Sequence, residues 1–148
     1  MADLERALQI ALQSHAGQKH KNGAPYIFHP IPVMIGCTAP DAQIVALLHD
    51  VVEHTDTTFE QLQAAGFSEE VIAALRLVTH QPGEPYDEYI GNLMANGISL
   101  EVKIADLEHN SDFRRLKEVD EAFVERLRRN LAAYQRLTAK RDELMGKL

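Results

Sequence analysis

The sequence predicts an all-α fold built as a single domain. Apolar residues recur at spacings of three and four along most of the chain, as at Leu4, Leu8 and Leu12, which is the pattern of helices with one buried face. No stretch shows the sustained alternation, β-branched enrichment and tight turns of a sheet. No internal repeat or low-complexity linker divides the 148 residues, a length suited to one core. We therefore expect one helical domain over residues 1–148.

The first helix is predicted over residues 4–15 and should end near Gly17, because glycine commonly terminates helices. The polar loop 17–25 follows and holds the densest group of cationic residues in the chain. Residues 26–30 then lead into a short apolar segment that ends at Gly36.

Helix-start signals mark the next three elements. Thr38 offers a capping hydroxyl and Pro40 a first-turn proline, so a helix is expected to begin there and continue through the apolar stretch 44–54. Thr57 and Glu60 have the spacing of a capping box, which predicts another start. Ser68 precedes a further helix that should break at residues 81–83.

Three more helices complete the predicted bundle. Residues 86–94 and 99 to about 112 show helical spacing of apolar side chains. From Val119 onward, apolar residues repeat at the same spacing among many Arg and Glu residues, which predicts a long amphipathic terminal helix lying over the core.

Composition excludes several classes of protein. Cys37 is the single cysteine, so no internal disulfide is expected, and the first residues lack the pattern of a signal peptide. No apolar run approaches the ~20 residues that span a bilayer. A net charge of −7 argues against binding a nucleic-acid polymer, because such binding draws its affinity from many cationic contacts. We expect a cytoplasmic protein that does not bind membranes; oligomeric state is left open.

The most informative residues are His49 and Asp50, which lie within the apolar stretch 44–54. Burying an imidazole or a carboxylate without a partner costs on the order of several kcal/mol, so the pair is expected to be hydrogen-bonded or to bind a metal. On one helix, Glu53 lies four residues after His49 and three after Asp50, so three polar groups can face one point.

Two further segments offer groups of the same kind. Asp106 lies among apolar residues with Asn110 four positions later, and His29 is held between Phe28 and Pro30. Two imidazoles and two carboxylates suit manganese, iron, zinc or another divalent ion and leave positions for water and substrate. The predicted ligands are His29, His49, Asp50 and Asp106. The alternative is a buried salt bridge without metal, with Lys103 pairing with Asp106.

Three blocks, residues 18–30, 46–53 and 102–110, make the chain resemble the HD-domain metal-dependent phosphohydrolases. Within them it resembles the alarmone (p)ppGpp 3′-pyrophosphohydrolases. The resemblance covers nearly the whole chain and implies a helical bundle of the HD type. It also implies Mn²⁺-dependent attack of water on the 3′-pyrophosphate of guanosine 3′,5′-bispyrophosphate, giving GDP or GTP and pyrophosphate. The partner is then a small nucleotide.

The resemblance also assigns roles to individual residues. Glu53 and His54 are predicted to be catalytic, Glu53 by orienting water or moving its proton. Lys21 and Asn110 are predicted to contact the substrate. His20 stands where the family tends to have an arginine that stacks on the guanine, and His54 stands where it usually has an aspartate.

These two departures keep two other hypotheses open: hydrolysis of a different nucleotide or phosphometabolite, and a nucleotide-binding regulatory module with weakened catalysis. Among the remaining residues with polar side chains, His15, His80 and His109 are expected to be structural, and Arg114 with Arg115 to form a surface charge pair.

Overall fold

The computed structural model describes residues 1–146, and their regular structure is helical. The predicted all-α class is confirmed, because the only β pairing among these residues is an isolated bridge between Lys19 and Pro25. The helices are α1 (Leu4–Ser14), α2 (Pro30–Ile35), α3 (Pro40–Leu48), α4 (Val51–His54), α5 (Phe59–Ala64), α6 (Glu69–Val78), α7 (Tyr86–Leu93), α8 (Gly97–Asn110) and α9 (Glu121–Leu144), with 3-10 turns η1 (Tyr26–Phe28) and η2 (Phe113–Arg115).

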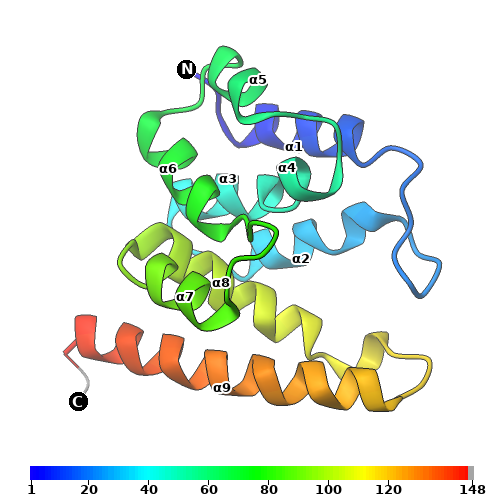
Figure 1. Cartoon of the computed structure of the whole chain (residues 1–148). Coiled ribbons are helices and arrows are strands. Elements are labelled where there is room, and N and C mark those ends of the chain that lie inside the picture. The colour runs from blue at the N-terminus through cyan, green and yellow to red at the C-terminus, as the bar shows by residue number, and fades with distance from the viewer. Residues whose placement is uncertain (147–148) are drawn as a thin grey trace.

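Helix α3 lies at the centre of the larger core. It packs against α1, α2, α6 and α8, and six of its nine residues are buried. Figure 1 shows α3 behind α4 and α6, with α1 above it and α8 below. Because α3 is apolar on most sides, packing it among four other helices removes apolar surface on every side from water, which stabilises the fold.

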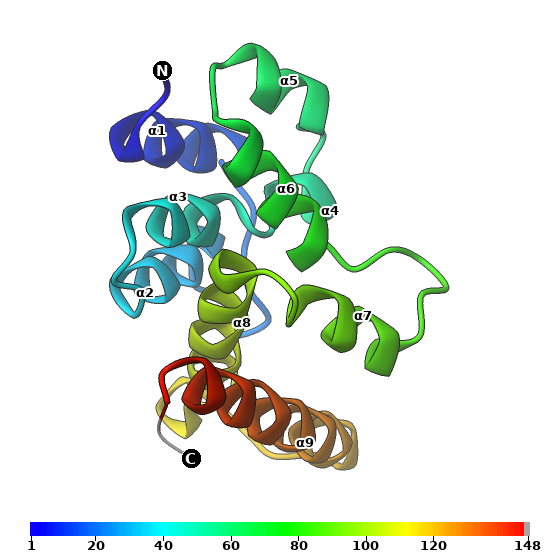
Figure 2. The ribbon, with the colours of Figure 1, turned by 90° about the vertical axis from the view of Figure 1, so that its left-hand side faces the viewer.

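A second, smaller core forms where α7 and α9 meet α8. Tyr89, Ile90 and Leu93 from α7 pack with Leu100, Ile104 and Leu107 of α8, and Ala133 and Leu137 of α9 close the cluster. Figures 1 and 2 show α9 lying across the far side of α8 from α3. Because α8 contacts both cores, its polar residues can face the space between them.

The predicted continuous helix through residues 44–54 is interrupted. α3 ends at Leu48 and α4 begins at Val51, so His49 and Asp50 form the turn between them. Asp50 is the N-cap of α4, with φ −103° and ψ −1°. The side chains of the dyad converge, since His49 Nε2 lies 3.2 Å from Asp50 Oδ2.

Tertiary contacts also moved two predicted caps. Thr58, not Thr57, caps α5 and forms the capping box with Gln61, while the Thr57 hydroxyl hydrogen-bonds Ser14 at 2.8 Å. The hydroxyl of Thr38 donates to Glu101, 63 residues away, instead of capping the next helix. The cap predicted at Ser68 is confirmed, because its side chain accepts from the Val71 amide.

The other helix boundaries agree with the sequence to within two residues at most ends. Among residues 1–146, no helix combines the length and the apolar character that crossing a bilayer requires.

Candidate metal centre

Four side chains from three separate segments meet between α3, α8 and the start of α2. The Nε2 atom of His29 lies 3.1 Å from Nε2 of His49, 2.9 Å from Oδ1 of Asp106 and 3.5 Å from Oδ2 of Asp50. The Nε2 atom of His49 lies 3.2 Å from the same Asp50 oxygen and 3.3 Å from the same Asp106 oxygen. The structure therefore brings together all four predicted ligands, with each histidine Nε2 within 3.5 Å of one oxygen of both aspartates.

These spacings fit a divalent ion. Ligands placed about 2.1 Å from one ion are separated by about 3.0 Å at adjacent octahedral positions and about 3.4 Å at tetrahedral ones. The five donor separations of 2.9–3.5 Å span these values. His29, His49 and Asp106 are nearly fully buried. Two imidazole nitrogens and two carboxylate oxygens are a donor set for manganese, iron or zinc.

Hydrogen bonds on the far side of each imidazole hold the rings in place. Nδ1 of His49 lies 2.5 Å from the carbonyl oxygen of Ala46, which can only accept, so Nδ1 carries a proton. Burial acts to lower the pKa of His49, but Asp50 and Asp106 raise it well above its usual value, so a metal ion would replace the proton on Nε2. Nδ1 of His29 contacts Nδ1 of His109 at 2.8 Å, and their rings stack with centroids 5.0 Å apart. If Nε2 of His29 is a ligand, its neutral ring donates from Nδ1 to His109.

Neighbouring cationic side chains keep the carboxylates of the cluster ionised although they are buried. Burial acts against the charged form of Asp106, but Lys103 and the two histidines hold the pKa of that carboxyl well below its usual value. Burial likewise opposes ionisation of Asp50, and His49 outweighs it and lowers the pKa of that carboxyl. Two carboxylates therefore remain available to a cation at neutral pH.

Asp106 uses its two oxygens for different partners. Oδ2 accepts from Lys103 Nζ at 2.9 Å, and Oδ1 faces the histidines and accepts from Asn110 Nδ2 at 3.2 Å. The salt bridge considered as an alternative to metal binding is thus present. It leaves the oxygen that faces the histidines free for a metal, so the two interactions are compatible.

Glu53 is fixed beside the cluster from two sides. Its Oε1 accepts from the His80 backbone N–H at 3.1 Å, and its Oε2 lies 2.7 Å from His54 Nε2. The hydrogen bond to Glu53 raises the pKa of His54, although partial burial opposes this. Asp50, Glu53 and His54 form a second group whose donor atoms lie close enough to share a cation. The predicted catalytic pair therefore adjoins the predicted ligands.

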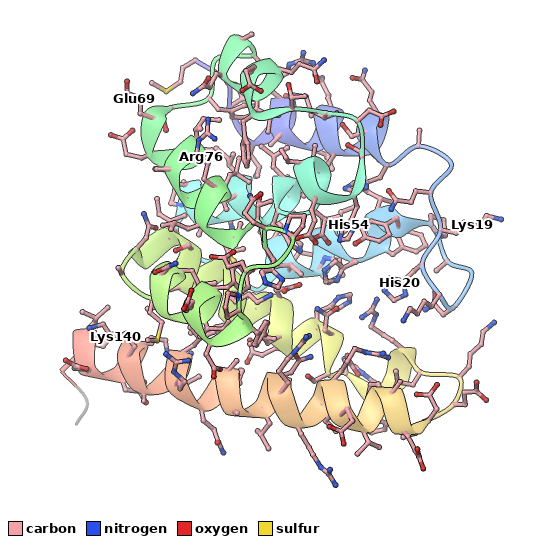
Figure 3. All side chains as sticks on the ribbon, viewed as in Figure 1. Lys19, His20, His54, Glu69, Arg76 and Lys140 are labelled. Carbon is pink, nitrogen blue, oxygen red and sulfur yellow. The ribbon has the colours of Figure 1, made fainter. Side chains whose placement is uncertain are left out.

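Of the predicted substrate contacts, His20 and Lys21 lie in the loop 17–25 and Asn110 lies on α8. The His20 ring faces Tyr26 and His29 with centroids 6.0 and 6.5 Å away, and its Nδ1 is buried without a hydrogen-bond partner among residues 1–146. Figure 3 shows Lys19 projecting outward and His20 on the inner side of the loop. Lys21 is exposed, with no contact to the cluster. Asn110 reaches the cluster only through Asp106.

Two side chains of this site were not predicted. Tyr26 donates its hydroxyl to Asp50 Oδ2 at 2.8 Å, and His109, which was expected to be structural, orients His29. Burial and the Asp50 charge raise the pKa of Tyr26, so the phenol stays protonated. Both residues lie inside the blocks 18–30 and 102–110. Their positions in these blocks were the only sequence feature that could have pointed to a role in the site. The contacts themselves join residues 24 and 80 positions apart, and these depend on how the helices pack.

Comparison with known sequences finds several relatives, although no family model matches the chain. It is 38% identical over 81 residues to a guanosine-3′,5′-bis(diphosphate) 3′-pyrophosphohydrolase of Aquifex aeolicus, an alignment covering 52% of this chain and 12% of the relative. It is 38% identical over 95 residues to the guanosine-3′,5′-bis(diphosphate) 3′-pyrophosphohydrolase MESH1 of Danio rerio, covering 59% and 52%. The matches thus span about half of the zebrafish protein and much less of the bacterial one.

A solved structure extends the similarity to the whole chain. It is a metazoan ortholog of SpoT described as hydrolysing ppGpp, and the two folds superpose with a TM-score of 0.70 at 24% identity, covering 100% of this chain and 98% of that one. The predicted HD-type bundle is therefore confirmed as the fold. The resemblance seen in the three sequence blocks is likewise confirmed, since the relatives that match this chain include proteins named as 3′-pyrophosphohydrolases of guanosine bispyrophosphate.

Proposed function

We propose that this chain is a metal-dependent hydrolase that removes pyrophosphate from the 3′ position of guanosine 3′,5′-bispyrophosphates. The observation that carries the proposal is the convergence of His29, His49, Asp50 and Asp106, with donor atoms 2.9–3.5 Å apart. The relatives named for this reaction support the choice of substrate. Mn²⁺ is the ion we propose, because the mixed nitrogen and oxygen donors suit it.

The reaction is a displacement at the phosphorus nearest the ribose. Water supplies the oxygen that bonds to this phosphorus, the bond from phosphorus to O3′ breaks, and O3′ leaves with a proton as the 3′-hydroxyl. The products are GDP or GTP and pyrophosphate. The bound metal would polarise a phosphoryl oxygen and lower the pKa of the attacking water.

Side chains of the protein would accept the proton of the attacking water and hold the metal ligands in position. Glu53, held by His54 and the His80 amide, is placed to accept the proton of the attacking water. The hydrogen bond to Glu53 raises the pKa of His54, which favours the protonated imidazole that donates to that carboxylate. His49 and His29 are oriented by Ala46 and His109, so they need no rearrangement to present Nε2.

The nucleoside would lie toward the loop 17–25. The half-buried imidazole of His20 offers a flat surface on which a base can stack, and Lys21 provides a free cation for phosphate. Asn110 would add a hydrogen bond to the ribose or a phosphate from the rim of the cluster.

The test is release of pyrophosphate from ppGpp by the purified protein with Mn²⁺. Asp106→Ala should abolish both metal binding and turnover. Asp87→Ala is the matched control, because Asp87 is 97% exposed on α7, and it should leave both unchanged. Full-rate turnover by Asp106→Ala would rule out the metal model.

Two other outcomes would contradict the proposed substrate or the proposed catalytic activity. Rates that favour nucleoside monophosphates or cyclic nucleotides over ppGpp would overturn the alarmone assignment. Tight ppGpp binding without turnover, with turnover restored by His54→Asp, would show a regulatory module instead of an efficient enzyme.

A further inference from the structure

A cavity of about 160 Å³ opens directly beside the candidate metal ligands, on the side formed by α6, α7, α8 and α9. His49, Asp50 and Asp106 form part of its wall. The remaining polar lining comes from Glu53, His80, Tyr86, Tyr89, Lys103 and Arg129, of which Tyr86, Tyr89 and Arg129 have no role in the site described above. This cavity lies away from His20 and the loop 17–25, which do not line it.

We propose that the cavity binds the terminal phosphate of the 3′-pyrophosphate group, and of the pyrophosphate product, with Arg129 and Tyr86 as its recognition residues. The inference rests on the proposed function, because it assumes that the attacked phosphate lies at the metal ligands. The terminal phosphate is then directed into the cavity, and the ribose and base remain outside it.

Size selects a small group for this cavity. Pockets that enclose whole small-molecule ligands are typically about 300–1,000 Å³, so this cavity suits a fragment of a nucleotide, such as one phosphate group, better than the whole nucleotide.

A metal ion at the candidate ligands would make the cavity a better site for an anion. The carboxylates of the lining are on Asp50, Glu53 and Asp106, and Lys103, Arg129 and the imidazoles of His49 and His80 line it as well. A divalent ion adds positive charge beside these groups. Phosphate should consequently bind more tightly when the metal is present.

Arg129 is the cation with unused hydrogen-bonding capacity. Lys103 is already paired with Asp106 at 2.9 Å, whereas Arg129 forms no ion pair with any other residue among 1–146 and donates one long hydrogen bond, from Nη2 to Asn130 Oδ1 at 3.5 Å. Its guanidinium carbon lies 4.2 Å from the centre of the Tyr86 ring, a stacking contact that leaves the other N–H groups at the guanidinium edge available. Arginine in this state binds phosphate with two parallel hydrogen bonds.

Tyr86 provides a second unused polar group. Its hydroxyl is buried and has no hydrogen-bond partner among the described residues. The neighbouring Tyr89 hydroxyl differs, because it donates to the Val78 carbonyl oxygen at 2.6 Å. A buried hydroxyl without a partner is costly, and a phosphate oxygen in the cavity would accept its hydrogen bond.

The experiment is calorimetric titration of inorganic pyrophosphate into protein loaded with Mn²⁺ and freed of excess metal. Arg129→Gln should weaken pyrophosphate binding about tenfold or more, and Tyr86→Phe about threefold, as expected for loss of one charged and one neutral hydrogen bond. Arg128→Gln is the matched control, because Arg128 is the adjacent residue of α9, is 74% exposed and, within the described part of the chain, pairs only with Glu125. It should bind as the unaltered protein does.

Equal pyrophosphate binding by Arg129→Gln and the unaltered protein would overturn the proposal, as would an equal loss in Arg128→Gln. Binding of the same strength without Mn²⁺ would also overturn it. The measurement needs no turnover, so failure to hydrolyse ppGpp, with the Arg129 effect intact, would reject the proposed function and leave the phosphate subsite standing.

Discussion

Asp106 holds a buried lysine and faces two histidines, so its replacement separates the structural role of the carboxylate from its proposed metal role. In Asp106→Asn the amide has nearly the same shape, but Lys103 loses its only ion-pair partner among the described residues, at 2.9 Å. The exposed fractions of the two side chains are 14% for Lys103 and 7% for Asp106. Breaking one partner of such a buried pair costs about 3–5 kcal/mol of unfolding free energy.

The loss is large enough to measure by thermal unfolding. In a domain of this size each kcal/mol lowers the melting temperature by about 2–4 °C, so Asp106→Asn without metal should melt about 6–20 °C lower. The double variant Lys103→Met, Asp106→Asn removes both charges and keeps a linear apolar side chain in place of lysine. It should regain at least half of the lost stability, because no buried charge is left unpaired.

The double variant should regain stability without regaining metal binding. The double variant still lacks the carboxylate that faces His29 and His49, so titration with Mn²⁺ should show the weakened binding of Asp106→Asn. Restored binding at the original affinity would show that Asp106 serves only the ion pair. A double variant no more stable than Asp106→Asn would refute the assignment of the stability loss to unpaired Lys103.

Three further predictions follow from other contacts. His109→Ala removes the partner of His29 Nδ1 and should lower Mn²⁺ affinity by about 10–100-fold, measured by metal titration; unchanged affinity would show that His29 needs no such support. Glu53→Gln should lower kcat for ppGpp by about 10²–10⁴-fold with Mn²⁺ affinity retained, and equal losses of both would make Glu53 a ligand instead of a base. Burial raises the pKa of the Cys37 thiol from 9.0 to about 12, so the folded state disfavours the thiolate. The contribution of this thiol to stability is complete below pH 9 and lost as pH rises from 9 toward 12. The unfolding free energy of Cys37→Ala should therefore fall less steeply over that range, and identical slopes would contradict the assignment.

The sequence by itself determined the helical class and the residues of the candidate site. Helical spacing and start signals are local properties, so α1, α6, α7 and α9 were predicted close to their observed bounds. His29, His49, Asp50 and Asp106 were identified because ionisable residues in apolar surroundings need a partner, whatever the arrangement of the helices. Their roles as metal ligands stay a prediction.

Only the tertiary structure decided how these residues meet. The break between α3 and α4 at His49 and Asp50 is not marked by glycine or proline, and the packing of α2 and α8 brings His29 and Asp106 to this dyad. Thr38 and Thr57 lost their predicted capping roles to partners 63 and 43 residues away. The contacts of Tyr26 and His109, and the cavity reached by Arg129, likewise join distant segments. Local sequence preferences do not encode such contacts, because they arise when separate helices bury their apolar faces together.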